Sequence, residues 1–410
     1  MTDLQSPPSR NWATDFDHTK EDYAADAPAV WGDLRSSCPV AHTDAHGGVW
    51  LPTRHADVAA IAHDTEHFSS ESVVVSIFKP DGSLVPTGFA PPITADPPFH
   101  AGSRRLLLPA FSPKAIAALE GSTRETCREL LDEVLAAGGD TVDAAAQYAQ
   151  HIPVRVIVDM LGLPREDGDK FRMFIHRILE KPGEYTGTLE PEETLVYYLT
   201  EKIQQRRSEP PRDDLIGFLL ETEMDGRRLT NDHIFGTIAL LIIAGIDTTW
   251  SAIGASLWHL AQHPADRQRL GDDPDVLPFA VEEFLRMYAP VTMARIAATE
   301  TEVGGCPVAE RDWVLLPFPA ANRDPEAFER ADEFVIDRQR NRHVAFGLGV
   351  HRCLGSNLAR MELTVAVDEW MKRIPDFELA DPDPSLVRWS TGQVRGPREL
   401  PLRILRSVEA

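Results

Sequence analysis

The sequence has few cysteines, an excess of acidic over basic residues and no long hydrophobic run. Its four cysteines among 410 residues form no Cys-x-x-Cys pair, which argues against a disulfide framework and a four-cysteine zinc site. With 41 Lys and Arg against 64 Asp and Glu, the net charge is −23. Such a charge opposes binding to nucleic acids and to anionic membranes.

The most apolar segment also argues against a membrane protein. It covers residues 238–246 and ends at Asp247, whereas a membrane-spanning helix needs about 20 apolar residues. Residues 1–26 are polar and acidic and lack the apolar core of a signal peptide. We therefore expect a reduced, cytoplasmic protein without a membrane partner.

Neither a repeat nor a low-complexity linker divides the chain. The 32 prolines are scattered between elements rather than gathered into one segment. We therefore expect a single domain over residues 1–410, with about residues 1–20 forming a loose N-terminal arm.

Apolar residues recur at helical spacing over most of the chain. Ser112-Pro113 is typical of a helix start, and that helix should end at Gly138-Gly139. The longest helix is expected from about 230 to 262, buried because residues 234–246 are apolar nearly all round. Other helices are expected at roughly 24–36, 54–62, 99–108, 143–161, 165–179, 191–207, 213–222, 275–288 and 355–373. Strands are expected at 49–53, 302–317 and within 376–406, so the fold class is mainly α with small β-sheets.

The most specific pattern is Phe346-Gly-Leu-Gly-Val-His-Arg-Cys353-Leu-Gly355. Gly347 and Gly349 allow a tight loop whose backbone approaches a flat ligand. Cys353 precedes a predicted helix, whose N-terminal amides favour the thiolate, the form that ligates iron. A buried free cysteine in a glycine-rich turn is the alternative, but the spacing Phe-x-x-Gly-x-x-x-Cys-x-Gly favours the ligand.

Polar residues interrupt the apolar central helix at Asp247-Thr248-Thr249. Gly245 and Thr248 share a helix face, and the small Ala244-Gly245 pair leaves room beside it. An Asp-Thr pair in an apolar segment is costly unless it is hydrogen-bonded or functional. From the residues alone, two interpretations stay open. Thr248 bonds back to the carbonyl four residues earlier while Asp247 pairs with a distant arginine, or the pair serves chemistry.

Five segments in this order resemble the signatures of the cytochrome P450 superfamily. They are Asp96-Pro-Pro-Phe-His100-Ala-Gly-Ser-Arg104-Arg105, Ala244-Gly-Ile-Asp-Thr-Thr249, Glu283-Phe-Leu-Arg286, Ala321-Asn-Arg-Asp-Pro325 with Phe334 and Arg338, and the segment 346–355. The resemblance covers the chain from about residue 20 to the C-terminus. It implies the single-domain P450 fold and a soluble, bacterial-type haem-thiolate monooxygenase.

The resemblance also implies a cofactor and its ligands. Haem b is expected, with the Cys353 thiolate as the axial ligand of the iron. Contacts with the haem are implied for Phe346, Gly347, Gly355, Ala244 and Gly245. His100, Arg104, Arg295 and His351 stand where the family places donors to the two propionates. Capping or surface roles are the alternative for both histidines, whereas Arg295 in an apolar stretch needs a buried anion.

Proton delivery is the role that the resemblance implies for Asp247 and Thr248. Glu283, Arg286 and Arg338 are implied to form a structural triad that braces the haem loop. Substrate-facing residues are implied in mainly apolar segments, which are 73–78 with Phe89, Ile238, Leu241 and Ile242, 290–293, and the turn near 390–391. The stretch 72–95 is expected to be an access loop.

The implied reaction inserts one oxygen atom of O2 into a small hydrophobic substrate, by hydroxylation or dealkylation. Electrons from NAD(P)H are expected through a separate ferredoxin reductase and ferredoxin, and the protein is expected to be a monomer. Seven basic against three acidic residues between Arg338 and Arg373 favour docking of an acidic ferredoxin there, the alternative being a solvated face. A peroxide-driven peroxygenase and a non-enzymatic haem-thiolate sensor are further alternatives, which the Asp247-Thr248 pair disfavours.

Overall fold

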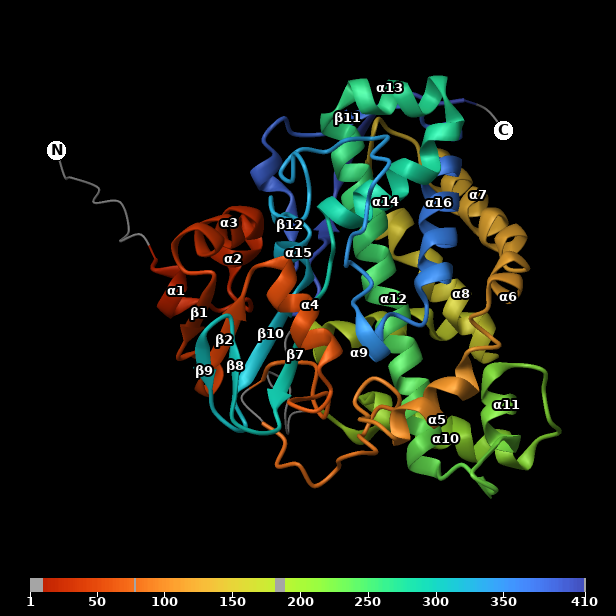
Figure 1. The fold of residues 1–410 in the computed structure, drawn as a ribbon. Coiled ribbons are helices and arrows are strands. Elements are labelled where there is room, and N and C mark those ends of the chain that lie inside the picture. Colours follow the sequence, from red (N-terminus) through yellow and green to blue (C-terminus); the bar gives the residue numbers. More distant parts are fainter. Residues whose placement is uncertain (1–9, 77–78, 181–188, 409–410) are drawn as a thin grey trace.

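The computed structural model describes residues 10–76, 79–180 and 189–408 (Figure 1). Most of the chain is helical, and the helices surround α12. Their bounds are α1 Trp12–Asp15, α2 Glu21–Ala25, α3 Ala27–Ser37, α4 His55–His63, α5 Phe99–Leu107, α6 Pro113–Ala117, α7 Glu120–Ala136, α8 His151–Leu161, α9 Gly168–Ile175, α10 Leu195–Ser208, α11 Leu215–Glu221, α12 Asn231–Gln262, α13 Pro264–Asp272, α14 Leu277–Met287, α15 Phe318–Ala321 and α16 Ser356–Arg373. This arrangement confirms the mainly α fold with a long central helix.

Helix α12 begins and ends where the sequence predicts. The Thr230 side chain caps its first turn by accepting a hydrogen bond from the His233 amide, and Pro264 follows its end. Gly245 brings α8 close, because a Cβ there would lie 2.6 Å from Ile157 Cδ1. By length and composition α12 could cross a membrane, but 72% of its most apolar window is buried within the protein. Its apolar surface is therefore taken up by the core.

The strands form a five-stranded sheet and several small ones. In the largest sheet the order is β1-β2-β10-β7-β3, and β10 pairs in parallel with β2 and antiparallel with β7. The strands are β1 Val40–Thr43, β2 Val49–Pro52, β3 Phe68–Ser69, β4 Thr141–Asp143, β5 Glu223–Met224, β6 Arg227–Arg228, β7 Thr292–Ala297, β8 Thr301–Val303, β9 Cys306–Val308, β10 Trp313–Pro317, β11 Asp376–Leu379, β12 Arg388–Trp389, β13 Pro397–Glu399 and β14 Pro401–Arg406. The sequence does not predict strand β7, because nearly all of its residues are buried and polar residues do not alternate regularly with apolar ones.

Several expected helices are interrupted in the structure. Asp26 ends α2 and caps α3 by accepting a hydrogen bond from the Ala29 amide. The helix expected from Ser112 is divided between α6 and α7. The helix expected at 143–161 begins instead with β4 and a π-helical turn over Ala145–Ala149. At Asp26 and at Asp143, whose carboxylate accepts from the Ala145 and Ala146 amides, a short-range side-chain hydrogen bond accompanies the break. Apolar periodicity does not report such bonds.

The expected N-terminal arm is only partly described. Residues 1–9 lie outside the described residues. Phe16 and His18 are buried, and Phe16 packs against Trp31 and Tyr23. The segment from about residue 12 onward is therefore part of the folded protein rather than a loose arm.

Candidate active site

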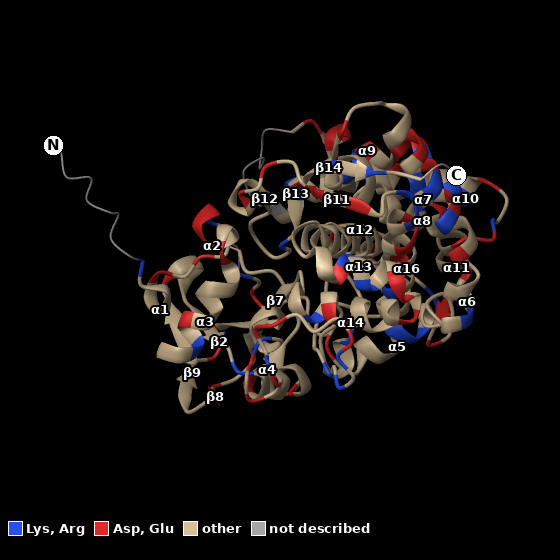
Figure 2. Cartoon of the chain, turned by 90° about the horizontal axis from the view of Figure 1, so that it is seen from above, with Lys and Arg blue, Asp and Glu red and all other residues tan. Residues whose placement is uncertain are grey.

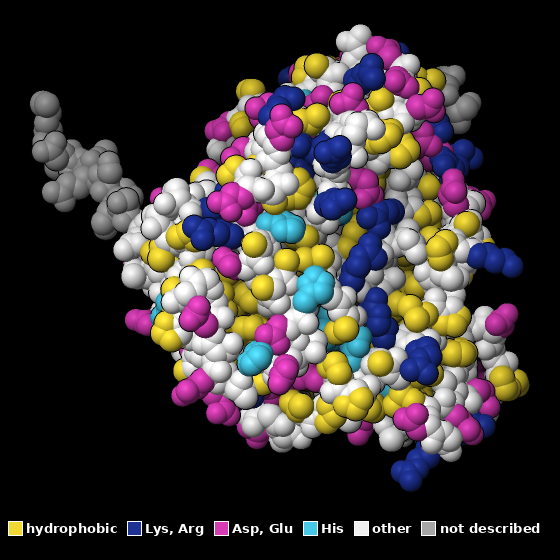
Figure 3. Space-filling model, viewed as in Figure 1, with side chains coloured by type: hydrophobic (Ala, Val, Ile, Leu, Met, Phe, Trp, Pro, Cys, Tyr) yellow, Lys and Arg dark blue, Asp and Glu magenta, His cyan; other side chains and the backbone are white. Residues whose placement is uncertain are grey.

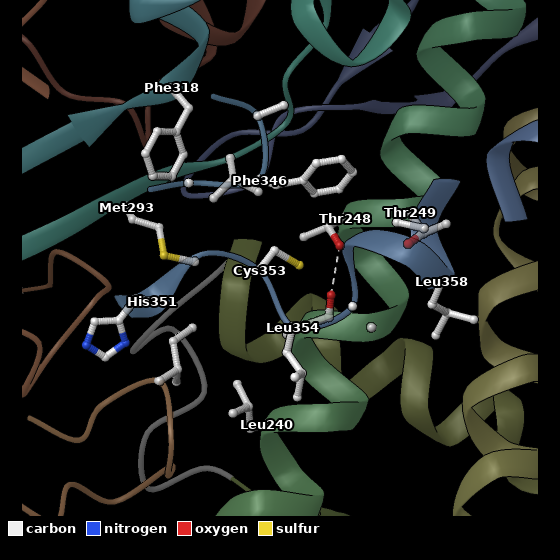
Figure 4. Close-up of a pocket in the computed structure, with 18 of the residues that line it drawn as sticks. Leu240, Thr248, Thr249, Met293, Phe318, Phe346, His351, Cys353, Leu354 and Leu358 are labelled. Atoms are coloured by element: carbon white, nitrogen blue, oxygen red, sulfur yellow. Dashed lines mark hydrogen bonds between the residues drawn. The ribbon is translucent and has the colours of Figure 1, made fainter. Parts of the chain in front are cut away.

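A deep cavity lies between α12, β7 and the segment that leads into α16 (Figure 4). The space between its lining atoms, counted with its opening to solvent, is about 1450 Å³. The lining is mainly apolar, and its few polar groups come from α5, α12, β7 and the cysteine loop.

The cysteine loop is the tight backbone turn that the sequence predicts. Gly347 and Gly349 adopt φ values of +65° and +66°, a region that favours glycine. A Cβ on Gly349 would also lie 2.3 Å from the Ala62 carbonyl oxygen. Within the turn, the Cys353 amide donates to the Phe346 carbonyl oxygen at 2.7 Å. The loop therefore holds the cysteine just ahead of α16.

Cys353 is the cysteine that lines the cavity. Its side chain is accessible, and Figure 4 shows its sulfur directed into the cavity. Burial beneath the surface raises the pKa of the thiol, while the Gly355 backbone and the charges of Arg104 and Arg352 lower it. Burial raises the pKa of Cys127 as well, to about 12, but Cys127 does not line the cavity.

Two arginines, Arg295 and Arg104, also line the cavity. Arg295 is buried, and its Nη1 donates to the carbonyl oxygen of the neighbouring Ala294 at 2.7 Å. Burial lowers the pKa of Arg295 to about 10, and Asp96 opposes the shift. Arg104 Nη2 donates to the Arg352 carbonyl oxygen at 2.5 Å, and burial lowers its pKa too. Because no carboxylate among the described residues pairs directly with either guanidinium, the two arginines are suited to an anionic ligand.

Two histidines lie beside these arginines. The His100 and His351 rings are 4.3 Å apart, and His351 Nε2 lies 3.0 Å from Ser70 Oγ. Burial, followed by the charge of Arg295, lowers the pKa of His351 to about 2. His100 Nε2 is buried and has no hydrogen-bond partner among the described residues. An unpartnered buried nitrogen facing this cavity is costly unless a ligand satisfies it.

The central helix presents Thr248, but not Asp247, to the cavity. Thr248 Oγ1 donates to the Ala244 carbonyl oxygen at 2.8 Å. Asp247 Oδ1 lies 2.7 Å from Arg398 Nη2 on β13, and both side chains are buried. The two contacts that one sequence interpretation expected are thus both present. Neither contact covers the side of Thr248 that borders the cavity. A role of the pair in proton delivery is therefore compatible with both contacts.

The expected triad at the end of α14 is confirmed. Arg286 Nε and Nη2 each lie 2.8 Å from the Glu283 carboxylate, and Arg338 Nε donates to the same carboxylate at 3.0 Å. All three groups are buried. Asn341 Nδ2 also donates to Glu283, at 3.0 Å. The triad therefore holds the chain that enters the cysteine loop and stays clear of the cavity.

The expected substrate-facing residues are only partly correct. Leu241 and residues 290, 291 and 293 line the cavity. Ile238 and Ile242 are buried elsewhere in the core, while Leu240 lines the cavity instead. Leu240, Ala244 and Thr248 are spaced by four and share a helix face.

The loop segments depart further from the expected substrate-facing set. Residues 73–76 and 390–391 do not line the cavity. Phe89 is 57% exposed to solvent, and Phe78 lies outside the described residues. Sequence reasoning missed several lining residues, which are Pro92, Ile93, Leu107, Phe111, Leu316 and Phe318. They come from elements without a local motif, so only the fold brings them to the cavity.

Comparisons with known proteins agree with this geometry. A family model described as Cytochrome P450 matches residues 171–383. The chain is 34% identical over 381 residues to mycinamicin IV hydroxylase/epoxidase of Micromonospora griseorubida, covering 91% of this chain and 94% of the relative. It superimposes on the crystal structure of CYP109E1 from Bacillus megaterium in complex with testosterone, with a TM-score of 0.83 and 29% identity, over 94% of this chain and 100% of the other. Cytochrome P450 PksS of Bacillus subtilis gives a TM-score of 0.84 and 30% identity, over 95% and 100% of the two chains.

Proposed function

The chain belongs to the cytochrome P450 superfamily, as a haem-thiolate monooxygenase of organic substrates, and we propose that the cavity described above is its haem and substrate site. The observation that carries the proposal is the placement of Cys353. Its sulfur faces the same cavity as the buried Arg295 and the half-buried Arg104, neither of which is paired with a carboxylate among the described residues.

The residues present fit the cofactor. A thiolate is supplied by Cys353, and charge-assisted hydrogen bonds to two propionates would come from Arg104 and Arg295. His100, whose Nε2 has no partner among the described residues, and His351 add ring nitrogens beside them. Gly347, Gly355 and the small Ala244 keep bulk away from a flat macrocycle. The haem, when bound, supplies the redox chemistry that transfers oxygen to the substrate.

The contribution of α12 is proton delivery. Thr248 Oγ1 donates its proton to the Ala244 carbonyl oxygen, so its lone pairs remain free to accept a hydrogen bond from water in the cavity. Asp247 lies one residue away and is held by Arg398. We propose that the Asp247 carboxylate exchanges Arg398 for water during turnover and so passes protons from outside the cavity toward Thr248.

The substrate is proposed to be a small hydrophobic molecule that is hydroxylated or dealkylated. Support comes from the apolar lining residues, which include Leu240 and Leu241 on α12 and Val291 and Met293 at the start of β7. Apolar walls orient such a substrate by shape. They contribute about 25 cal/mol of binding free energy for each Å² of apolar surface removed from water. The relatives' names point to similar organic ligands, since one structure holds testosterone.

The electron donor is proposed to be an acidic ferredoxin, supplied by a reductase and NAD(P)H, in the cytoplasm, with the enzyme acting as a monomer. From the sequence, the ferredoxin is expected to dock on the seven basic residues between Arg338 and Arg373, and the structure narrows this set. Four of its seven cations are held in ion pairs, which are Arg338–Glu283, Arg360–Glu282, Lys372–Asp368 and Arg373–Asp132. The exposed cations of the segment outside these ion pairs are Arg340, Arg342 and Arg352.

These three arginines define the proposed docking patch. Lys and Arg side chains form a stripe down the middle of the face in Figure 3, and Figure 2 shows basic side chains beside α14 and near α5. The patch leads up to Cys353 in the sequence, and Arg352 is the immediate neighbour of that cysteine. Rim charges of this kind act mainly on the rate of encounter.

The proposal is tested by ligation and by product. Reduced wild-type protein with carbon monoxide should absorb at the long Soret wavelength of thiolate-ligated haem, and Cys353→His should lose that band while the control Cys38→Ser keeps it. With ferredoxin, reductase and NADH, the product should carry label from isotopic dioxygen. Turnover with hydrogen peroxide alone, and none with the electron-transfer proteins, would instead identify a peroxygenase.

A further inference from the structure

Two histidines and an aspartate meet away from the cavity, between α1 and the turn that joins β1 to β2. Asp17, His18 and His46 each offer one ligand atom, and the three atoms lie within 4.8 Å of one another. Within residues 10–76, 79–180 and 189–408 this is the one group of three or more His, Cys, Asp or Glu residues so arranged. The haem chemistry uses none of them.

His18 is held in the tautomer that a metal ligand needs. Its Nε2 lies 2.9 Å from the Gln393 side-chain amide. When that amide is oriented to satisfy both ends, its nitrogen donates to the Thr292 carbonyl oxygen at 2.6 Å and its oxygen accepts from His18 Nε2 and the Val75 amide. The proton therefore sits on Nε2 and leaves the Nδ1 lone pair bare.

Asp17 and His46 already have the spacing of two ligands of one ion. His46 Nε2 lies 3.3 Å from Asp17 Oδ1, and ligand atoms about 2.0–2.1 Å from a tetrahedral Zn²⁺ are separated by roughly this distance. His46 reaches this position from a left-handed backbone conformation, with φ of +54°, which is uncommon for a residue other than glycine. The turn is thus built so that the imidazole points at the carboxylate.

The cluster is reachable by an ion and carries the charge to attract one. The Asp17 and His46 side chains are each 15% exposed, whereas His18 is buried beneath them. Lys20 Nζ lies 3.8 Å from Asp17 Oδ2 but is largely exposed, so it is able to swing away. Two imidazole nitrogens and one carboxylate suit borderline cations such as Zn²⁺ rather than Ca²⁺ or Mg²⁺, which prefer oxygen ligands.

We propose that Asp17, His18 and His46 bind a divalent transition-metal ion of the Zn²⁺ class, with water in the remaining position. The site ties three distant segments together. The Gly392 amide donates to the His18 carbonyl oxygen at 2.8 Å, and Gln393 links His18 to Thr292 at the start of β7. Bound metal therefore stabilises the N-terminal segment against the turn at 390–396 and against the strand that supplies Met293 to the cavity.

The test uses untagged, haem-loaded, full-length protein freed of metal by chelation. Isothermal titration with ZnCl2 should show one equivalent bound, and the melting temperature should rise with zinc because the ion binds the folded state. His46→Asn keeps a residue that tolerates the left-handed turn, and Asp17→Asn keeps the shape of the acid. Each should weaken zinc binding by about 10-fold or more. His67→Ala is the control, since His67 pairs with Asp64 without a third donor.

Zinc anomalous scattering from soaked crystals should then place the ion between the three side chains. Failure of wild-type protein to bind zinc, or unchanged binding in both His46→Asn and Asp17→Asn, would overturn the proposal. A loss of affinity in His67→Ala equal to that in His46→Asn would do the same, because it would show non-specific binding to surface histidines. None of these outcomes depends on monooxygenase activity.

Discussion

Asp247 Oδ1 lies 2.7 Å from Arg398 Nη2, and the two side chains are buried together behind the face of α12 that lines the cavity. Arg398 is itself positioned by Ser251 Oγ at 3.1 Å and by the Trp250 ring, whose centroid is 4.3 Å from its guanidinium carbon. These contacts stabilise the Asp247 carboxylate in its ion pair with Arg398. It takes part in proton transfer only if the ion pair opens.

Replacing Asp247 by Asn therefore has two expected consequences. Turnover should slow, because the amide carries no proton between solvent and Thr248. The free energy of unfolding should fall by about 3 kcal/mol, since Arg398 keeps a buried charge without its counter-charge. Steady-state kinetics and urea unfolding measure the two effects. Unaltered turnover in a protein that is measurably destabilised would assign Asp247 a structural role alone.

Thr248→Ala should act on coupling rather than on binding. It removes the hydroxyl that borders the cavity and the hydrogen bond to Ala244, but no contact with the loop that holds Cys353. Haem content and substrate affinity should stay near those of the wild type, while NADH consumption yields more hydrogen peroxide and less product. The ratio of product to NADH is the measurement. Thr248→Ser, which restores the hydroxyl, should recover most of the coupling, and a tightly coupled Thr248→Ala enzyme would exclude the proposed role.

Arg295→Met should change the haem-free and haem-loaded proteins in opposite directions. Burial without a paired carboxylate destabilises the Arg295 charge and lowers its pKa to about 10, so the apolar replacement should raise the melting temperature of the haem-free protein. The same change removes a donor to a propionate, so the rate of haem loss to a scavenging apoprotein should increase. Equal destabilisation of both forms would show that Arg295 serves the core and not an anion.

Arg342→Glu should slow electron transfer without altering the site. Arg342 is exposed in the proposed docking patch, so reversing its charge should slow stopped-flow reduction by an acidic ferredoxin. Raised ionic strength should slow the wild type in the same direction, since charges beyond about 8 Å are screened at physiological salt. A wild-type rate that stays flat or rises with salt would contradict docking through this patch.

Arg360→Glu serves as the contrasting variant. Arg360 is paired with Glu282 at 2.5 Å and lies over the Phe346 ring, so its reversal places two carboxylates together beside the cysteine loop. Loss of haem, rather than slower docking alone, is the expected result. From the sequence, Arg360 belongs to the basic segment between Arg338 and Arg373 that was proposed as a docking surface. In the structure it instead supports the cysteine loop through Glu282 and Phe346.

The sequence by itself determined the family and singled out the cysteine that we propose as the cofactor ligand. A few residues at short, fixed spacing make three features recognisable, namely Cys353, the glycines of its loop and the Glu283–Arg286 pair. Such spacing determines the local backbone geometry and which side chains share a helix face. The long central helix was equally predictable, since an apolar run with a cap at one end and Pro264 beyond the other has one stable conformation.

The tertiary structure decided which of these residues meet. Apolar periodicity could not tell that Leu240 lines the cavity and Ile242 does not, because both belong to a helix that is apolar nearly all round. The partners of Asp247 and Arg360 come from 151 and 78 residues away along the chain, and no local pattern encodes such contacts. The meeting of Asp17, His18 and His46 depends likewise on Gln393 near the other end of the chain. Charge pairing and tautomer choice are properties of neighbours in space, so they appear only once the chain is folded.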